Sequence, residues 1–170
     1  METNGNNNNG TTSSKVMESK KQRSDDPPRI VKFETLDERI QRLLQEAVKA
    51  RTASYSPYSN FKVGACVECV DGTLYGGCNV ENASYPVGIC AERCAYVKAI
   101  SDGRRQMRSV AIVAQQEKHF TTPCGLCRQF MSEFGDAPVF LAKPDLRDVL
   151  VTSVSELLPL SFQINEDYSF

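Results

Sequence analysis

Two short stretches, Cys90-Ala91-Glu92 and Pro123-Cys124-Gly125-Leu126-Cys127, contain the three cysteines and the carboxylate around which the chain is organised. A catalytic zinc ion takes three protein ligands and keeps a fourth position for water, whereas a structural zinc ion is closed by four. A lone Cys-x-x-Cys motif is weak, because redox proteins and zinc ribbons also use it. Together, however, the two stretches supply three thiolates and one acid. They predict an open, hydrolytic zinc site with Cys90, Cys124 and Cys127 as ligands.

The neighbours of these cysteines support the same interpretation. Glu92 follows a ligand by two residues at the start of a predicted helix, so it can reach the metal-bound water without binding the metal, as a proton shuttle must. Pro123 suits the first turn of a second helix, where its missing N–H costs nothing. The positive end of that helix favours thiolates. Three thiolates exceed the charge of Zn²⁺ by about one, and we expect Arg93 to donate hydrogen bonds to them.

These residues resemble the all-cysteine variant of the zinc deaminase signature. Two further stretches, Tyr55–Phe61 (YSPYSNF) and Asn79–Tyr85 (NVENASY), together with Cys90–Arg93 (CAER), resemble the small homotetrameric cytidine deaminases of free nucleosides. The likeness extends from about Leu36 to Phe162. It implies one zinc ion per chain and hydrolysis of cytidine and 2'-deoxycytidine to uridine and 2'-deoxyuridine with release of ammonia, a reaction of pyrimidine salvage. Zinc-activated hydroxide would attack C4 while Glu92 moves the protons.

The resemblance also implies contacts with the substrate inside one subunit. In the family, residues corresponding to Asn79 and Glu81 bind the ribose hydroxyls, and an aromatic ring corresponding to Phe61 packs on the pyrimidine. The backbone at Ala91 helps to fix the polar edge of the base. Without the resemblance, Asn79 and Glu81 read equally well as ordinary polar loop residues.

A second set of contacts would come from a neighbouring subunit. Ala83 and Tyr85 match positions that reach the neighbouring site in the tetramer, and the terminal Phe170 could close over a neighbouring site in the same way. The homotetramer and these shared roles follow from the resemblance alone.

The composition excludes several classes of protein. With 170 residues, a net charge of -1 and a pI near 5.9, the chain lacks the basic character of a nucleic-acid binder. No run approaches the ~20 apolar residues of a membrane span, and the N-terminus has no apolar signal-peptide core. Seven cysteines without a secretory signal favour reduced thiols over disulfides. We therefore expect a cytosolic protein with no membrane or nucleic-acid partner.

Hydrophobic periodicity predicts one α/β domain at residues 31–163, between a disordered N-terminal tail at 1–30 and a C-terminal tail at 164–170. The order of its elements implies a five-stranded mixed sheet with helices on its faces, and the resemblance implies the three-layer α/β/α cytidine deaminase-like fold. A capping box at Thr35–Glu38 would open the first helix and one at Ser153–Glu156 the last. The predicted helices span 36–52, 89–101, 123–134 and a short stretch after 153, and the predicted strands span 61–70, 73–80, 109–114, 138–142 and 148–151. The last two strands are joined too closely for a parallel crossover, so we expect them to run antiparallel.

The remaining cysteines and the histidine have simpler interpretations. Cys94 lies one helical turn after Cys90, so it could complete a closed four-cysteine structural site, although this would leave Glu92 without a task. Cys66, Cys69 and Cys78 read as small strand residues. His119, the only histidine, reads as a loop residue.

Two further function hypotheses remain open from the sequence. Another small-molecule deaminase of this fold, such as one acting on blasticidin S, would have the same catalytic groups. An RNA or DNA cytosine deaminase, or a zinc-bearing nucleic-acid binder, would be expected to show basic and aromatic residues interleaved, which this chain lacks. A CMP or dCMP deaminase would need phosphate-binding groups near the ribose, where Glu81 would repel a phosphate.

Overall fold

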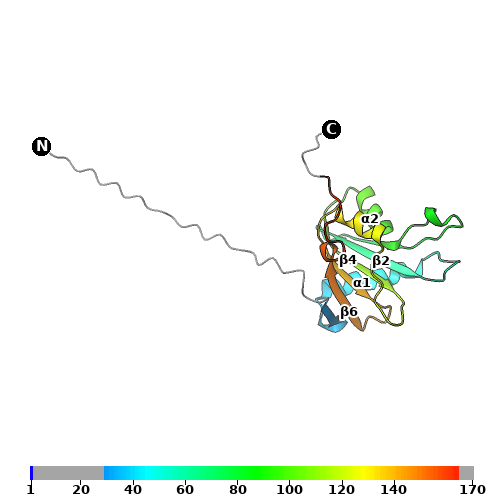
Figure 1. The fold of residues 1–170 in the computed structure, drawn as a ribbon. Helices are drawn as coiled ribbons and strands as arrows, with labels where there is room; N and C mark the ends of the chain where they lie inside the picture. Colours follow the sequence, from blue (N-terminus) through cyan, green and yellow to red (C-terminus); the bar gives the residue numbers. More distant parts are fainter. Residues whose placement is uncertain (2–28, 165–170) are drawn as a thin grey trace.

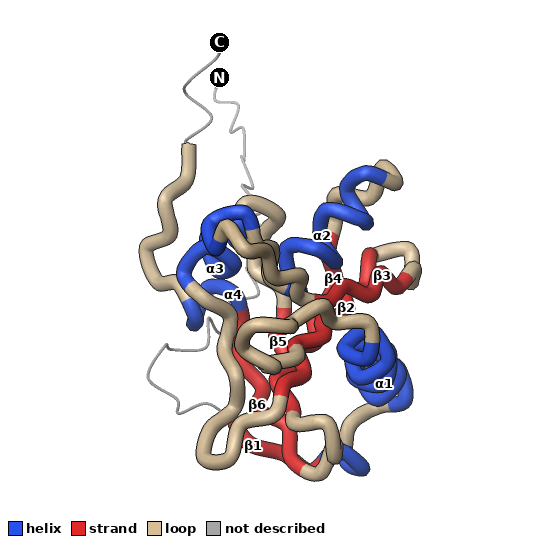
Figure 2. The backbone as a smooth tube through the Cα atoms, turned by 90° about the vertical axis from the view of Figure 1, so that its right-hand side faces the viewer, coloured by secondary structure: helices blue, strands red, loops and turns tan. Residues whose placement is uncertain are grey.

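The computed structural model describes residues 29–164 together with Met1. A mixed sheet of six strands in the order β1-β6-β5-β4-β2-β3 lies between helices on its two faces (Figures 1 and 2). Only β4 and β5 pair in parallel. Its strands are β1 (Arg29–Lys32), β2 (Val63–Cys69), β3 (Leu74–Cys78), β4 (Met107–Ala114), β5 (Pro138–Ala142) and β6 (Asp148–Ser153). The α-helices are α1 (Glu38–Thr52), α2 (Ala91–Ser101), α3 (Gly125–Ser132) and α4 (Val154–Leu157).

The helices and strands predicted from the sequence are all present, with their ends shifted by up to two residues. The prediction of five strands was wrong, because β1 adds a sixth by pairing antiparallel with β6, so that Ile30 lies opposite Leu150. Three of the four β1 residues are exposed. The strand therefore carries no buried pattern, and backbone pairing alone defines it. Arg29 and Ile30 thus leave the predicted tail, whose residues 2–28 lie outside the described part, as does Phe170.

Helix α1 covers one face of the sheet. Its apolar stripe packs on residues of β2, β4, β5 and β6, and consists of Ile40, Leu43, Leu44 and Ala47. The N-cap is Asp37, whose side chain accepts a hydrogen bond from the backbone N–H of Ile40 at 2.9 Å. The capping box predicted at Thr35 was therefore wrong, because Thr35 belongs to a 3₁₀ turn and donates to the Lys32 carbonyl instead.

Helices α2, α3 and α4 cover the opposite face. Tyr96 of α2 is fully buried and meets the rings of Phe130 and Phe134 at centroid distances of 6.2 and 5.8 Å. The predicted capping box of α4 is confirmed by reciprocal hydrogen bonds between Ser153 and Glu156. The predicted antiparallel pairing of β5 with β6 is confirmed as well. The aromatic contacts pack the middle of α2 against the end of α3 on this face.

Two glycines let the sheet touch a helix backbone directly. A Cβ atom on Gly77 of β3 would lie 2.4 Å from Ala95 N and 2.5 Å from Ala91 O, both in α2. On the other face, a Cβ atom on Gly64 would lie 2.1 Å from Ala47 O in α1. Any side chain at either position would overlap main-chain atoms. The first turns of α2 are therefore fixed by close packing on β3.

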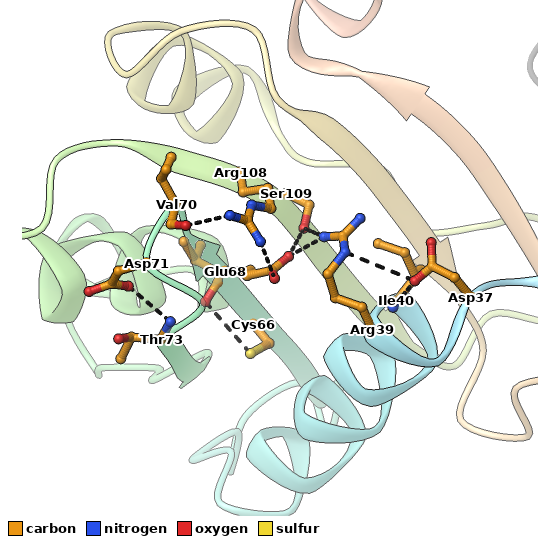
Figure 3. Close-up of polar contacts among 11 residues, drawn as sticks. Asp37, Arg39, Ile40, Cys66, Glu68, Val70, Asp71, Thr73, Arg108 and Ser109 are labelled. Atoms are coloured by element: carbon orange, nitrogen blue, oxygen red, sulfur yellow. Dashed lines mark hydrogen bonds and ion pairs between the residues drawn. The ribbon is translucent and has the colours of Figure 1, made fainter.

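A buried carboxylate joins the far end of the sheet to α1. The side chain of Glu68 on β2 is only 3% exposed and is paired with Arg39 of α1 and Arg108 of β4 (Figure 3). The hydroxyl of Ser109 donates to the same carboxylate at 2.7 Å. Because a buried charge is costly unless it is paired, this network ties three elements together. Within residues 29–164, no helix is long and apolar enough to cross a bilayer.

Candidate active site

Both helices that carry the predicted ligands begin at a cysteine. Cys90 is the N-cap of α2 and Cys124 is the N-cap of α3, and both have extended backbones. Neither sulfur caps its helix. Helices α2 and α3 thus both start two residues later than predicted, so Cys90 and Pro123 precede the first turns that we expected them to occupy. Glu92 and Cys127 do lie in the first turns.

The three predicted sulfur ligands lie together. The Sγ atoms of Cys90 and Cys124 are 3.8 Å apart, those of Cys124 and Cys127 are 3.6 Å apart, and all three lie within 4.8 Å of one another. A tetrahedral zinc ion with Zn–S bonds of about 2.3 Å requires sulfurs about 3.8 Å apart. The donor set and its spacing therefore fit zinc, with one position left open. In the described part of the chain, Cys94 and His119 do not belong to this cluster.

Arg93 supplies positive charge to the sulfur cluster. Its Nη2 atom donates to Cys90 Sγ at 3.8 Å. The pKa of the Cys90 thiol lies well below its ordinary value, first because the thiol of Cys127 donates to its sulfur and then because Arg93 does. The pKa of Cys127 is correspondingly raised, because the shared proton stays on its sulfur. Cys90 is thus prepared to act as an anionic ligand.

Glu92 is buried beside these sulfurs. The residue is 5% exposed, and the pKa of its carboxyl is raised, chiefly because burial penalises the charged form. The negative charge of Cys90 acts in the same direction. A carboxyl group with a raised pKa holds a proton more readily than an ordinary carboxyl group, as a group that accepts and returns protons must. The position therefore suits the shuttle predicted from the sequence.

A cavity of about 630 Å³ opens next to this cluster. This volume lies in the usual range for small-molecule sites. Of the residues predicted from the sequence, its walls include Phe61, Asn79, Glu81, Tyr85, Cys90, Ala91, Glu92 and Cys124. Cys127 is fully buried behind the wall, and Ala83 is exposed outside it. The elements that form the cavity are the loops before β2, after β3 and before α3, with the start of α2.

Known proteins share this architecture. Residues 37–143 match the family model described as the cytidine and deoxycytidylate deaminase zinc-binding region. The chain belongs to this deaminase family. A cytidine deaminase of Sporosarcina psychrophila is 45% identical over 135 residues, which cover 77% of this chain and 96% of that protein. A probable cytidine deaminase of Dictyostelium discoideum is 40% identical over 122 residues, which cover 72% and 82%.

A solved structure agrees with this membership. The crystal structure of cytidine deaminase from Burkholderia pseudomallei aligns with a TM-score of 0.68 at 43% identity, covering 71% of this chain and 97% of that one. The predicted zinc-dependent deaminase and its mixed α/β sheet are confirmed by these matches. Zinc is the cofactor, and the cluster of Cys90, Cys124 and Cys127 is the place that can hold it.

Asn79 of this deaminase joins two walls of the cavity. Its Nδ2 atom donates to the Phe61 carbonyl at 2.8 Å, and its Oδ1 atom accepts from Val63 N at 2.8 Å and from Ser54 Oγ at 2.5 Å. The amide is therefore already committed to the loop that carries Phe61. Its predicted role toward the ribose must be compatible with these three bonds.

Glu81 makes a second link between the same two loops. Its carboxylate accepts hydrogen bonds from Tyr58 N at 2.9 Å and Ser59 N at 3.2 Å, and also from the Ser59 hydroxyl. The Ser59 hydrogen bond is the main cause that lowers the pKa of Glu81. The group is an anion at neutral pH, and it lies in the cavity wall.

Sequence reasoning missed two side chains near the deaminase site. The hydroxyl of Thr121 lines the cavity, is buried, and has no hydrogen-bond partner within residues 29–164. Arg128, directly after the last ligand, donates to the loop that enters α3. The only sequence signal for these residues was that they lie close to the Cys124–Cys127 motif, and this does not indicate where their side chains point. Tertiary contacts decide both roles.

Proposed function

We propose that this deaminase hydrolyses cytidine and 2'-deoxycytidine to uridine and 2'-deoxyuridine, with release of ammonia. One observation carries the proposal: the buried acid Glu92 lies beside three sulfurs spaced for zinc, in the wall of a cavity of about 630 Å³. The relatives named cytidine deaminase, at 45% and 40% identity, support the same substrate class. Pyrimidine salvage would be the corresponding cellular role.

The chain's own residues move the protons in this reaction. A zinc ion, when held by the three cysteines, would supply the Lewis acidity that lowers the pKa of water toward about 7. Glu92 takes a proton from the attacking water and delivers it to N3 of the pyrimidine. It then takes the remaining proton of the added hydroxyl group and gives it to the amine that leaves C4. One water is consumed and one ammonia is released, so Glu92 ends the cycle in its starting state.

Other cavity residues orient the nucleoside. Phe61 supplies an apolar ring for the pyrimidine, and Ala91 lines the same cavity. Asn79 and Glu81 present polar atoms for the ribose hydroxyls. Because the pKa of Glu81 is lowered, its negative charge would repel the phosphate of CMP or dCMP. A nucleoside therefore fits this wall better than a nucleotide.

The test is ammonia release from cytidine by the wild type and by Glu92→Gln, with zinc content measured for both. The variant should keep its zinc and lose a factor of about 10² to 10⁴ in kcat, because it cannot transfer protons. The matched control is Glu38→Gln, the same change in the first turn of α1. Wild-type protein that binds zinc and releases no ammonia from cytidine would overturn the proposal. Blasticidin S is then the substrate to assay next.

We also propose a homotetramer whose sites are shared between subunits. Tyr85 is 79% exposed and meets Tyr58 edge-to-face at the cavity rim, with ring centroids 6.3 Å apart. Ala83 is exposed on the same loop. Both could therefore reach a neighbouring subunit, and Phe170 keeps its proposed role there. An active monomer in sedimentation would exclude this arrangement. The cytosolic location and the absence of a nucleic-acid partner stay predictions.

A further inference from the structure

The side chain of Arg128 bonds to the segment just before the second ligand pair and to the end of α4. Its Nε atom donates to the Pro123 carbonyl at 2.7 Å, and its Nη2 atom donates to the Thr122 hydroxyl at 3.1 Å. Its Nη1 atom reaches the Leu157 carbonyl at the end of α4, at 2.9 Å. One guanidinium group therefore joins the loop that enters α3 to the end of the neighbouring helix.

The backbone of the same residue closes the ligand loop. Arg128 N donates to Cys124 O at 2.9 Å, which is the first main-chain hydrogen bond of α3. Two bonds from one residue thus fix consecutive carbonyls, those of Pro123 and Cys124. The peptide between them sets the direction in which the Cys124 side chain leaves the chain. Arg128 therefore holds the carbonyl groups on both sides of the Cys124 Cα atom.

The N-cap of α3 explains why such a residue is needed. A helix usually begins at a residue whose side chain accepts from the exposed backbone N–H groups. Cys124 makes no such bond, because its sulfur is turned toward Cys90 and Cys127. The beginning of α3 thus lacks the local contact that would fix its conformation. Arg128 replaces that contact from one turn further along the helix.

We infer that Arg128 is a positioning residue for the zinc site: it orients Cys124 by holding the Thr122–Pro123 segment. It does not contact the sulfurs through any hydrogen bond found in residues 29–164. A lysine could satisfy only part of this role, since its single ammonium group does not match three acceptors in different directions. For its effect on turnover the inference rests on the proposed function, whereas its effect on zinc binding does not.

The test is the rate at which the zinc-loaded protein loses metal to an excess of a coloured chelator. Arg128→Gln should lose zinc roughly 10- to 100-fold faster than the wild type, which corresponds to the fall in metal affinity that follows removal of a partner outside the ligand set. Arg128→Lys should fall between the two. The ligand-field spectrum of the cobalt-substituted protein should also change in Arg128→Gln, because the Cys124 sulfur is less well fixed. Zinc loss at the wild-type rate with an unchanged cobalt spectrum would overturn the inference.

Two control variants separate positioning from general stability. Arg104 also bridges a loop, through the Asp102 carbonyl and the carboxylates of Asp71 and Asp102, at the other end of β2 and β3. Arg104→Gln should destabilise the fold without accelerating zinc loss. Gln129 donates to the Phe162 carbonyl at 2.8 Å, and Gln129→Ala removes a contact with the C-terminal segment only. If either control lost zinc as fast as Arg128→Gln, the effect would belong to overall stability or to that segment.

The outcome is independent of the substrate. Fast zinc loss from Arg128→Gln would support the positioning role even if the wild type failed to deaminate cytidine. Normal zinc retention, together with cytidine turnover by the wild type, would overturn the positioning role alone.

Discussion

The first residues of α2 and of α3 are stabilised in different ways, although neither helix has a side-chain N-cap. Each starts at a cysteine whose sulfur leaves the helix uncapped, and each has an arginine within the next four residues. Arg93 points at the sulfur of Cys90, whereas Arg128 points away from the sulfurs to main-chain carbonyls. Arg93 places a positive charge beside the sulfur of Cys90, whereas Arg128 fixes the direction of the Cys124 side chain. Residues of one type at similar spacing therefore have separate tasks in one metal site.

The packing of the two helices explains this division. The first turns of α2 rest on β3 at Gly77, where backbone meets backbone, so their position needs no further support. No strand glycine approaches α3 in this way among the described residues, and α3 spans only eight residues. It is held by side-chain hydrogen bonds and by aromatic contacts of its end with Tyr96 of α2. Its start therefore depends on Arg128.

The largest effect on stability should come from Gly77→Ala, which disrupts the packing of α2 on β3. The new Cβ atom would lie 2.4 Å from Ala95 N, so the helix must move away from the sheet. We expect a loss of about 1–3 kcal/mol or more in the free energy of unfolding, measured by urea denaturation, and a lower zinc content. The control is Gly76→Ala, where the nearest atom would be the Ala50 side chain at 3.2 Å. Equal losses for the two variants would refute the packing account.

A smaller effect should come from Arg93→Gln, which removes charge but leaves the packing in place. Arg93 favours the Cys90 thiolate, so the pKa of this thiol should rise in the variant. This pKa is measured by following the thiolate absorbance of the zinc-free protein as a function of pH. Because protons then compete at higher pH, the loaded variant should release zinc at a higher pH than the wild type. Arg128→Gln removes no charge beside Cys90 and should raise the pKa of this thiol less than Arg93→Gln does, and a rise of the same size would contradict the distinction between the two arginines.

The smallest effect should come from Cys94→Ala. Cys94 lies in α2 one turn after Cys90 and stands outside the sulfur cluster. We expect one zinc ion per chain and a kcat within about twofold of the wild type, measured by metal analysis and ammonia release. A variant that lost its metal would restore the closed four-cysteine site as an explanation.

The sequence was sufficient for the ligand cluster and the core. Cys90, Cys124 and Cys127 stand in short motifs whose spacing is typical of zinc ligands. The periodic apolar residues of the helices and strands indicate which side chains are buried. The sequence was insufficient where contacts between distant segments determine an element or the partners of a side chain. Strand β1 is mostly exposed and exists through its pairing with β6. The partners of Arg128 include a carbonyl 29 residues away, which no local pattern can indicate.

The two loop-to-loop links made by Asn79 and Glu81 also have a consequence for affinity. They join the loop that carries Phe61 to the loop that leads into α2 before any ligand arrives. Ordering a loop on binding costs conformational entropy, which lowers affinity by that amount. In this protein the loops are ordered when the chain folds, so this entropy cost lowers the stability of the fold and not the affinity for the ligand. A small, polar ligand can therefore be bound by a few contacts, because the cavity already has its shape.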